Sequence, residues 1–186
     1  SLRYIVFDGA VLSPEVVHEW FKLHAENQPK LINMYGITET TVHLTYCEIK
    51  REKLVDQIRY PIGRGFPGVD LYILDKRHRL LPPGFPGEPY VGGALVGRGY
   101  LDPTLSAQRF LELSFGGSEK QRVYRTGDLV RRLPDGDLDY LGRLDNQVKF
   151  QGFRIELDEI SAWVEKHAAV SQALTIMHTT AQNNTH

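Results

Sequence analysis

The chain has 186 residues, with 22 basic and 23 acidic side chains and a formal net charge of −1. This balance argues against a protein that binds nucleic acid through its phosphate backbone, because such binding needs a basic face. The hydrophobic fraction of 41% is sufficient for a packed core. The single cysteine, Cys47, excludes an internal disulfide and a cysteine-rich zinc site.

Nothing in the sequence indicates a membrane protein. No apolar run in it approaches the roughly 18–20 residues of a membrane-spanning helix. The opening stretch, SLRYIVFDGA, lacks the basic, apolar and small-residue order of a secretory signal. We therefore expect a cytoplasmic protein with no membrane partner.

The first elements follow the order strand, helix, strand. Residues 3–7 form a short apolar run that stops at Asp8-Gly9, and residues 31–34 form a second one. Between them, Ser13-Pro14-Glu15 is typical of a helix start, and Pro29 is expected to end that helix. This order predicts a βαβ unit of an α/β sheet.

From Pro61 onward the pattern changes to short strands between proline and glycine turns. Asp135-Gly136 predicts a hairpin. We expect a helix over 105–113 capped by Thr104 and a second helix over 157–167. The predicted strands are 69–75, 88–91, 124–133, 138–141, 147–155 and 170–177, with Gly152 inside the fifth.

Three familiar kinds of site are unsupported. Residues 63–68 match G-x-G-x-x-G, but the dinucleotide fingerprint needs a helix after the glycines and a strand-like run, VDLYILD, follows here. The seven histidines form no H-x-x-x-H or H-E-x-x-H pair, and no G-x-S-x-G nucleophile elbow occurs.

Three polar stretches carry candidate chemistry. The turn over 33–41 combines an amide, an aromatic ring, hydroxyls and a carboxylate, which suits a purine and a metal-bound phosphate but also an ordinary polar turn. Asp128 follows the tight turn Thr126-Gly127, so it either accepts ribose hydroxyls or caps its own turn. Residues 142–149 concentrate charge around Arg143, either for phosphate binding or as a solvated linker.

Together these stretches resemble an adenylation domain of a nonribosomal peptide synthetase, in the adenylate-forming superfamily. The resemblance rests on GRGFPG with the strand after it (63–75) and on four further stretches. These are NMYGITETTVH (33–43), GEPYVGGALVGRGYLDPTLSAQRF (87–110), YRTGDLVRRLPDG (124–136) and YLGRLDNQVKFQGFRIELDEI (140–160).

The resemblance implies an ATP-dependent enzyme. An amino-acid carboxylate would attack the α-phosphate, and the acyl group would pass to the phosphopantetheine thiol of a peptidyl carrier domain, beside a neighbouring condensation domain. ATP and Mg²⁺ are the implied cofactors. By family position the nucleotide-binding residues are Asn33, Tyr35, Gly36, Asp128, Tyr140 and Arg143, the catalytic residues are Thr38, Glu39 and Arg143, and Glu39 is the metal ligand.

The family also implies a substrate pocket and a moving subdomain. Asp145 matches the hinge between subdomains, and Lys149 and Gly152 match the loop used in thioester formation. The pocket would be lined by Val6, Asp8, Gly9, Met34, Val42 and His43. Met34, Val42 and His43 resemble members that activate threonine, whereas a generic apolar pocket is the alternative.

The sequence departs from the family at several positions. Asp8 stands where glycine is usual and Ala10 where glutamate is usual, and a carboxylate in the pocket would favour a basic over an apolar side chain. Gln151 replaces a common arginine, and Ser161 a common acid. The phosphate loop, the aspartate for the substrate amino group and the C-terminal catalytic lysine of the family are not found in the sequence.

We therefore expect a mixed α/β fold truncated at both ends, and an isolated chain that is inactive. Residues 1–60 would end a large α/β subdomain, 61–144 would form a small antiparallel β-barrel-like subdomain, and 145–186 would hold the hinge and a partial α+β C-terminal subdomain. Two other functions remain open: a non-catalytic docking fragment, and an acyl- or aryl-CoA ligase of the same superfamily.

Overall fold

The computed structural model describes residues 2–26, 28–54, 60–115, 117, 119–150 and 153–178. The chain separates into two compact units, and the division falls between Gly142 and Arg143. None of the helices within the described residues is both long and apolar enough to cross a membrane.

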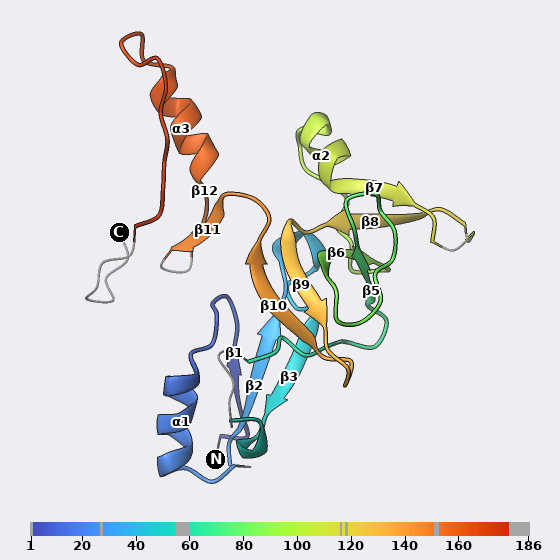
Figure 1. Ribbon diagram of the computed structural model, residues 1–186, viewed down its shortest axis with the longest axis vertical. Coiled ribbons are helices and arrows are strands. Elements are labelled where there is room, and N and C mark those ends of the chain that lie inside the picture. Colours follow the sequence, from blue (N-terminus) through green and yellow to red (C-terminus); the bar gives the residue numbers. More distant parts are fainter. Residues whose placement is uncertain are drawn as a thin grey trace. The chain divides into compact units, whose positions relative to one another are not determined.

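The first sheet of unit 1 contains the predicted βαβ element. Its strands lie in the order β1 (Tyr4–Phe7), β2 (Lys30–Tyr35), β3 (Thr45–Ile49) and β4 (Arg64–Gly65). Helix α1 (Pro14–Leu23) connects β1 to β2, which pair in parallel (Figure 1). Ser13 is the N-cap of α1 as predicted, but the helix ends at Leu23, before Pro29. Strand β3 was not expected, and it pairs with β2 in antiparallel orientation.

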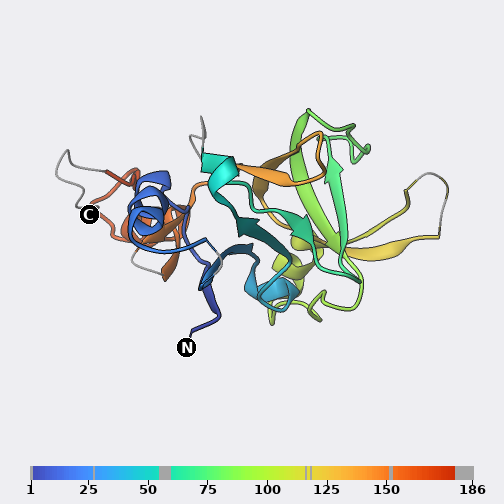
Figure 2. The same ribbon diagram turned by 90° about the horizontal axis from the view of Figure 1, so that it is seen from below.

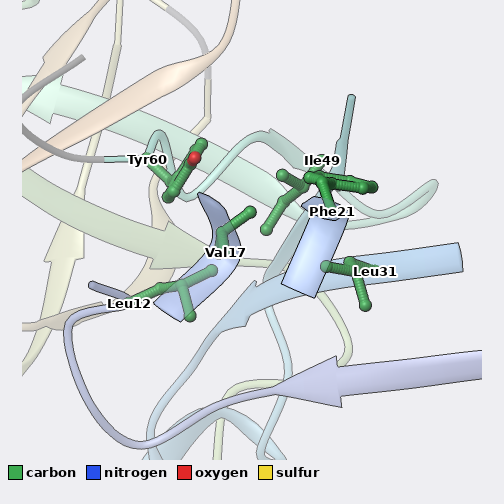
Figure 3. Packing of buried hydrophobic residues seen from close by; sticks show 6 residues of the cluster. All are labelled: Leu12, Val17, Phe21, Leu31, Ile49 and Tyr60. Atoms are coloured by element: carbon green, nitrogen blue, oxygen red, sulfur yellow. The ribbon is translucent and has the colours of Figure 1, made fainter. Parts of the chain in front are cut away.

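One face of this sheet is buried by α1. Leu31 and Ile49 are paired across β2 and β3, so they lie on the same face, and neither exceeds 2% exposure. Val17 and Phe21 of α1 lie against them (Figure 3), and Leu12 and Tyr60 complete the cluster. Helix α1 therefore covers one face of β1 and β2 and does not cover the opposite face.

The second sheet of unit 1 is antiparallel. Its strands lie in the order β10 (Leu138–Arg143), β9 (Asp128–Arg132), β6 (Pro86–Gly92), β8 (Gln121–Arg125) and β7 (Phe110–Leu113), and β5 (Asp70–Leu74) also pairs with β6. Figure 1 and Figure 2 show β7 and β8 running out as an arm. The described strands leave the sheet open, so the barrel-like region of the prediction is not a closed barrel. Strand β5 directly follows the glycine turn, which agrees with the rejection of a dinucleotide site.

Two predicted boundaries in this sheet are wrong. The run over 124–133 is two strands, because Thr126 and Gly127 turn the chain between β8 and β9, with Gly127 at φ 75°. The predicted helix over 105–113 is instead α2 (Pro103–Arg109), and its N-cap is Asp102 rather than the predicted Thr104. The Asp102 carboxylate accepts from the N–H groups of Thr104 and Leu105. The remaining residues form β7, which pairs with β8.

Two short segments outside the sheets complete unit 1. The 3₁₀ turn η1 (Thr38–Thr40) follows β2, and a second one, η2 (Arg51–Leu54), follows β3. The main chain also joins the two sheets. Leu138 N donates to the Gly63 carbonyl at 2.8 Å, and Ile62 N donates to the Leu138 carbonyl at 2.8 Å.

Unit 2 is a hairpin followed by a helix. Strands β11 (Gln147–Phe150) and β12 (Phe153–Glu156) pair in antiparallel orientation, so the single strand predicted over 147–155 is wrong. Helix α3 (Leu157–Glu165) follows directly. Residues 170–177 form no strand, also against prediction. Side chains of α3 hold this segment instead: Thr175 N donates to Ser161 Oγ at 2.9 Å and Ala173 N to Glu165 Oε1 at 2.9 Å.

Replacing Phe21 with alanine tests the packing of α1 on the first sheet. Removing a ring that is 2% exposed leaves a cavity, so we expect Phe21→Ala to lower the free energy of unfolding by about 3 kcal/mol. Urea denaturation followed by circular dichroism measures this change. Val16→Ala is the control, since Val16 lies on the same helix but is 57% exposed. Equal stability of the two variants would contradict this packing.

Candidate active site

The buried carboxylate of Asp128 lies between two tyrosines. Asp128 begins β9 and is 2% exposed. The hydroxyl of Tyr35, at the end of β2, donates to Oδ2. The hydroxyl of Tyr140, on β10, donates to Oδ1 at 3.2 Å. The two tyrosine ring centroids are 6.0 Å apart. The structure therefore brings together three of the residues predicted to bind the nucleotide.

Gly36 allows the chain to fold back on itself directly after Tyr35. A Cβ at this position would lie 1.5 Å from the carbonyl oxygen of Val42, so no other residue fits without movement of the backbone. Thr41 and Val42 both have positive φ, at 60° and 72°. Such values cost about 1–3 kcal/mol for residues other than glycine, so the surrounding contacts must impose them.

Glu39 lies in η1, within this loop. The hydroxyl of Tyr100 donates to the Glu39 carboxylate and is 3.1 Å from the hydroxyl of Tyr124. Burial raises the pKa of Tyr100 above its usual value, and the hydrogen bonds with Glu39 and Tyr124 act in the same direction. Tyr100 therefore remains protonated at neutral pH and can donate to Glu39.

Further hydrogen bonds connect the loop of Glu39 with the segment over 95–100. Gly97 N donates to the carbonyl of Glu39 at 2.8 Å, and Thr41 Oγ1 donates to the carbonyl of Leu95 at 3.0 Å. The segment over 95–100 thus fixes both the backbone and the side chain of Glu39.

The donor set around Glu39 is compatible with Mg²⁺. Within the part of the chain that the structure describes, no group of three or more His, Cys, Asp or Glu side chains could enclose a metal ion. Mg²⁺ commonly binds one or two carboxylates together with substrate phosphates, so the Glu39 carboxylate with the adjacent Thr38 hydroxyl fits such a shared site.

The predicted pocket residues lie on the sheet face that α1 does not cover, or beside it. Val6 pairs with Ile32, and Met34 follows two positions later, so alternation places Val6 and Met34 on one face. Val6 is 48% exposed and Val42 is 53% exposed. Gly9, with φ 81°, turns the chain after β1.

Two polar side chains of the predicted pocket, His43 and Asp8, are within hydrogen-bond distance of each other. His43 Nε2 lies 3.2 Å from Asp8 Oδ2, and both side chains are about one-third exposed, at 39% and 33%. The unusual Asp8 therefore has a partner among the predicted pocket residues.

Asn33 is buried and occupied within the protein. The residue is 4% exposed, and its side-chain Nδ2 donates to the carbonyl of Pro61 at 2.9 Å. This bond links β2 to the segment before β4. Binding of adenine by Asn33 stays a prediction.

The remaining predicted residues belong to unit 2. Arg143 forms a forked ion pair with Asp145, through Nε to Oδ1 at 2.8 Å and Nη2 to Oδ2 at 2.6 Å. Asp145 Oδ1 also accepts from Gln147 N at 3.3 Å. Lys149 is exposed on β11, opposite Arg154. Gly152 lies outside the described residues. The roles predicted for all four residues stay predictions.

Three residues of this region have no role predicted from the sequence. Tyr100 and Tyr124 are the hydroxyl partners beside Glu39, and the buried Glu88 lies on β6. Glu88 was detectable as an acidic residue inside the apolar run GEPYVGG. The pairing of Tyr100 with Glu39 joins residues 61 positions apart, which no local pattern reveals.

Comparisons of sequence identify the family. The AMP-binding enzyme family matches residues 1–101. Malpinin synthetase of Mortierella alpina is 50% identical over 177 residues, covering 95% of this chain and 2% of that protein. The dimodular nonribosomal peptide synthase of Bacillus subtilis (strain 168) is 48% identical over 178 residues, covering 95% of this chain and 7% of that protein.

Comparisons of structure agree. PA1221, a nonribosomal peptide synthetase protein containing adenylation and PCP domains, has a TM-score of 0.85 at 28% identity, covering 96% of this chain and 36% of that one. The Vibrio cholerae adenylation domain AlmE, in complex with glycyl-adenosine-5′-phosphate, has a TM-score of 0.81 at 28% identity, covering 99% and 34%.

The chain belongs to the AMP-binding enzyme family. Its sequence and fold are those of part of a nonribosomal peptide synthetase adenylation domain, as the resemblance of its motifs implied. It spans 2% and 7% of the two curated relatives and about a third of the two solved chains.

Replacing Gly36 with alanine tests the tight loop beside the site. The added methyl group would overlap the Val42 carbonyl, so we expect Gly36→Ala to lower the free energy of unfolding by about 3 kcal/mol. Thermal and urea unfolding measure the loss. Gly92→Ala is the matched control, because its Cβ would meet its nearest neighbours at 3.4 Å, which is ordinary contact. A Gly36→Ala protein as stable as Gly92→Ala would refute the close approach.

Proposed function

We propose that this chain is the ATP- and amino-acid-handling part of an enzyme that activates an amino acid as its adenylate. The aminoacyl group would then be loaded on the phosphopantetheine thiol of a carrier domain in nonribosomal peptide synthesis. The observation that carries this proposal is the buried Asp128 carboxylate held between the hydroxyls of Tyr35 and Tyr140. Membership of the AMP-binding enzyme family supports it.

Asp128 is the proposed ligand of the ribose hydroxyls. Each oxygen of an ionised carboxylate can accept more than one hydrogen bond, so the two tyrosine hydroxyls do not exhaust its capacity. Tyr35 and Tyr140 fix the direction of the carboxylate, and the ring of Tyr35 offers a face for the adenine. Gly36 keeps this ring at the end of β2, and Asn33 would contact the adenine edge.

Glu39 and Thr38 are the proposed holders of Mg²⁺ and phosphate, with Arg143 as a cation for the ribose or phosphate. Bound Mg²⁺ would supply positive charge to the triphosphate. Tyr100 and Gly97 hold Glu39 in place through its carboxylate and its carbonyl.

The proposed reaction needs positioning more than covalent help from the protein. A carboxylate oxygen of the amino acid attacks the α-phosphorus of ATP. The bond from that phosphorus to the oxygen bridging to the β-phosphorus breaks, and pyrophosphate leaves. In the second step a thiolate attacks the acyl carbon and AMP leaves. Alignment of the two anions and stabilisation of developing charge account for most of the acceleration in such reactions.

Threonine is the proposed amino acid. Asp8 holds Nε2 of His43, which leaves Nδ1 as the ring atom for a substrate hydroxyl. The threonine methyl group would pack on Met34 and Val42, with Val6 and Gly9 shaping the rest of the pocket. A site that hydrogen-bonds a substrate hydroxyl discriminates strongly against analogues that lack it.

The proposed organisation follows the family. Residues 1–60 would end the large subdomain, 61–144 would form the second, and 145–186 would begin the small one, with Asp145 as hinge and Lys149 and Gly152 in the thioester-step loop. Division of the chain into two units after Gly142 supports a boundary in this region. PA1221 contains adenylation and PCP domains, which supports a carrier domain as partner. A condensation domain would be the other neighbour.

Asp128→Ala tests the nucleotide site by binding alone. We expect wild-type chain to bind ATP saturably and Asp128→Ala to bind it at least about tenfold more weakly, because two ribose hydrogen bonds are lost. Isothermal titration calorimetry measures both affinities. Asp139→Ala is the control, since Asp139 pairs with Arg131 on the same sheet. Unchanged affinity in Asp128→Ala would refute the site, and no binding by the wild type at millimolar ATP would favour the docking fragment.

His43→Ala tests the substrate. In the complete protein that carries these residues, we expect ATP–pyrophosphate exchange to prefer threonine over the isosteric valine by about 100-fold or more. His43→Ala should reduce this preference about tenfold. Exchange that favours an apolar or basic amino acid would overturn the threonine proposal. Exchange with an aryl or fatty acid alone would indicate the ligase alternative.

A further inference from the structure

Glu88 is a buried carboxylate in the middle of the second sheet. It lies on β6 and is 8% exposed. Its oxygens accept from Arg125 Nε, at 3.0 Å to Oε1 and 3.0 Å to Oε2, and Oε1 also accepts from Gly127 N at 2.9 Å. Burying an ionised carboxylate costs free energy unless it is paired and hydrogen-bonded, and both conditions are met here.

The residues that Glu88 binds form the turn that presents Asp128. Gly127 precedes Asp128 directly and has a positive φ of 75°. The next position of β6 holds the same turn, since Thr126 Oγ1 donates to the Pro89 carbonyl at 2.9 Å. Thr126 Oγ1 in turn accepts from Asp128 N at 3.2 Å. Two consecutive residues of β6 thus fix the backbone on both sides of the Gly127 peptide.

The acceptor of the Gly127 N–H is a carboxylate rather than a neutral group. Hydrogen bonds to an ionised group are about twice as strong as neutral ones. The Glu88 bond fixes the N–H direction of Gly127, and therefore the peptide from which the Asp128 backbone continues. Burial, and after it the nearby negative charge of Glu88, raise the pKa of Tyr90 to about 12, so Tyr90 stays protonated at neutral pH.

We propose that Glu88 is a positioning residue for nucleotide recognition: through Gly127 N it sets the place of the Asp128 carboxylate and so the preference for a ribose with both hydroxyls. This inference rests on the proposed role of Asp128 as the ribose ligand. Glu88 itself does not touch the nucleotide, and its ion pair with Arg125 holds the carboxylate toward the turn.

The test compares two nucleotides that differ only at the sugar. Calorimetry of the chain gives dissociation constants for ATP and 2′,3′-dideoxy-ATP, and their ratio measures how well the ribose hydroxyls are read. We expect Glu88→Ala to reduce this ratio about tenfold, equivalent to about 1.4 kcal/mol. Glu88→Gln keeps an uncharged acceptor for Gly127 N, so it should reduce the ratio only about threefold.

Asp137→Ala separates positioning from loss of stability. Asp137 is a buried carboxylate, 6% exposed, that accepts from Arg64 Nε at 2.9 Å and lies between β9 and β10. We expect it to lower the melting temperature as Glu88→Ala does, while its ATP to dideoxy-ATP ratio stays at the wild-type value. A reduced ratio in Asp137→Ala would mean that any buried carboxylate pair has this effect, and would overturn the proposal.

The outcomes for Glu88 and Asp128 are distinguishable. If Asp128→Ala removes the sugar preference and the Glu88 variants keep the wild-type ratio, the inference about Glu88 is wrong and the nucleotide site stands. If Asp128→Ala keeps the wild-type ratio, the proposed ribose role itself fails. Should Glu88→Ala not fold, the Glu88→Gln ratio decides, and a wild-type value there would overturn the proposal.

Discussion

The Asp128 carboxylate joins the two sheets of unit 1 through its hydrogen bonds. It is almost fully buried, and a buried carboxylate is tolerated only where donors surround it. Two of those donors are hydroxyls from different sheets, Tyr35 at the end of β2 and Tyr140 on β10. Satisfying one charge therefore holds the first sheet against the second at the place where a nucleotide is proposed to bind.

The conformation of the loop that carries Glu39 depends on a close approach of two backbone segments. Gly36 admits the Val42 carbonyl where a side chain would stand, and Thr41 and Val42 take positive φ values to complete the reversal. The 95–100 segment then binds the Glu39 backbone and carboxylate. Strained and glycine-dependent backbone of this kind persists only where many contacts impose it, as they do at functional sites.

Local signals predicted elements well where one residue decides the conformation, and poorly where a distant partner does. Ser13-Pro14 marked the start of α1 because a cap acts within a single turn. The apolar run over 110–113 fits the predicted helix over 105–113, yet it forms a strand because β8 lies beside it. The apolar run over 170–177 predicts a strand, but its backbone N–H groups donate to Ser161 and Glu165 of α3 instead.

The amino-acid sequence by itself determined the family, the order of the main elements and the residues that carry candidate chemistry, because glycine turns, helix caps and polar stretches are local features. Only the tertiary structure decided that Tyr35 and Asp128, 93 positions apart, share a hydrogen bond, and that Asp8 meets His43. It also showed that Glu88 accepts a hydrogen bond from the N–H of Gly127, the residue before Asp128. The physical reason is that the burial and pairing of charges depend on which strands become neighbours. No single stretch of sequence specifies the order of the strands.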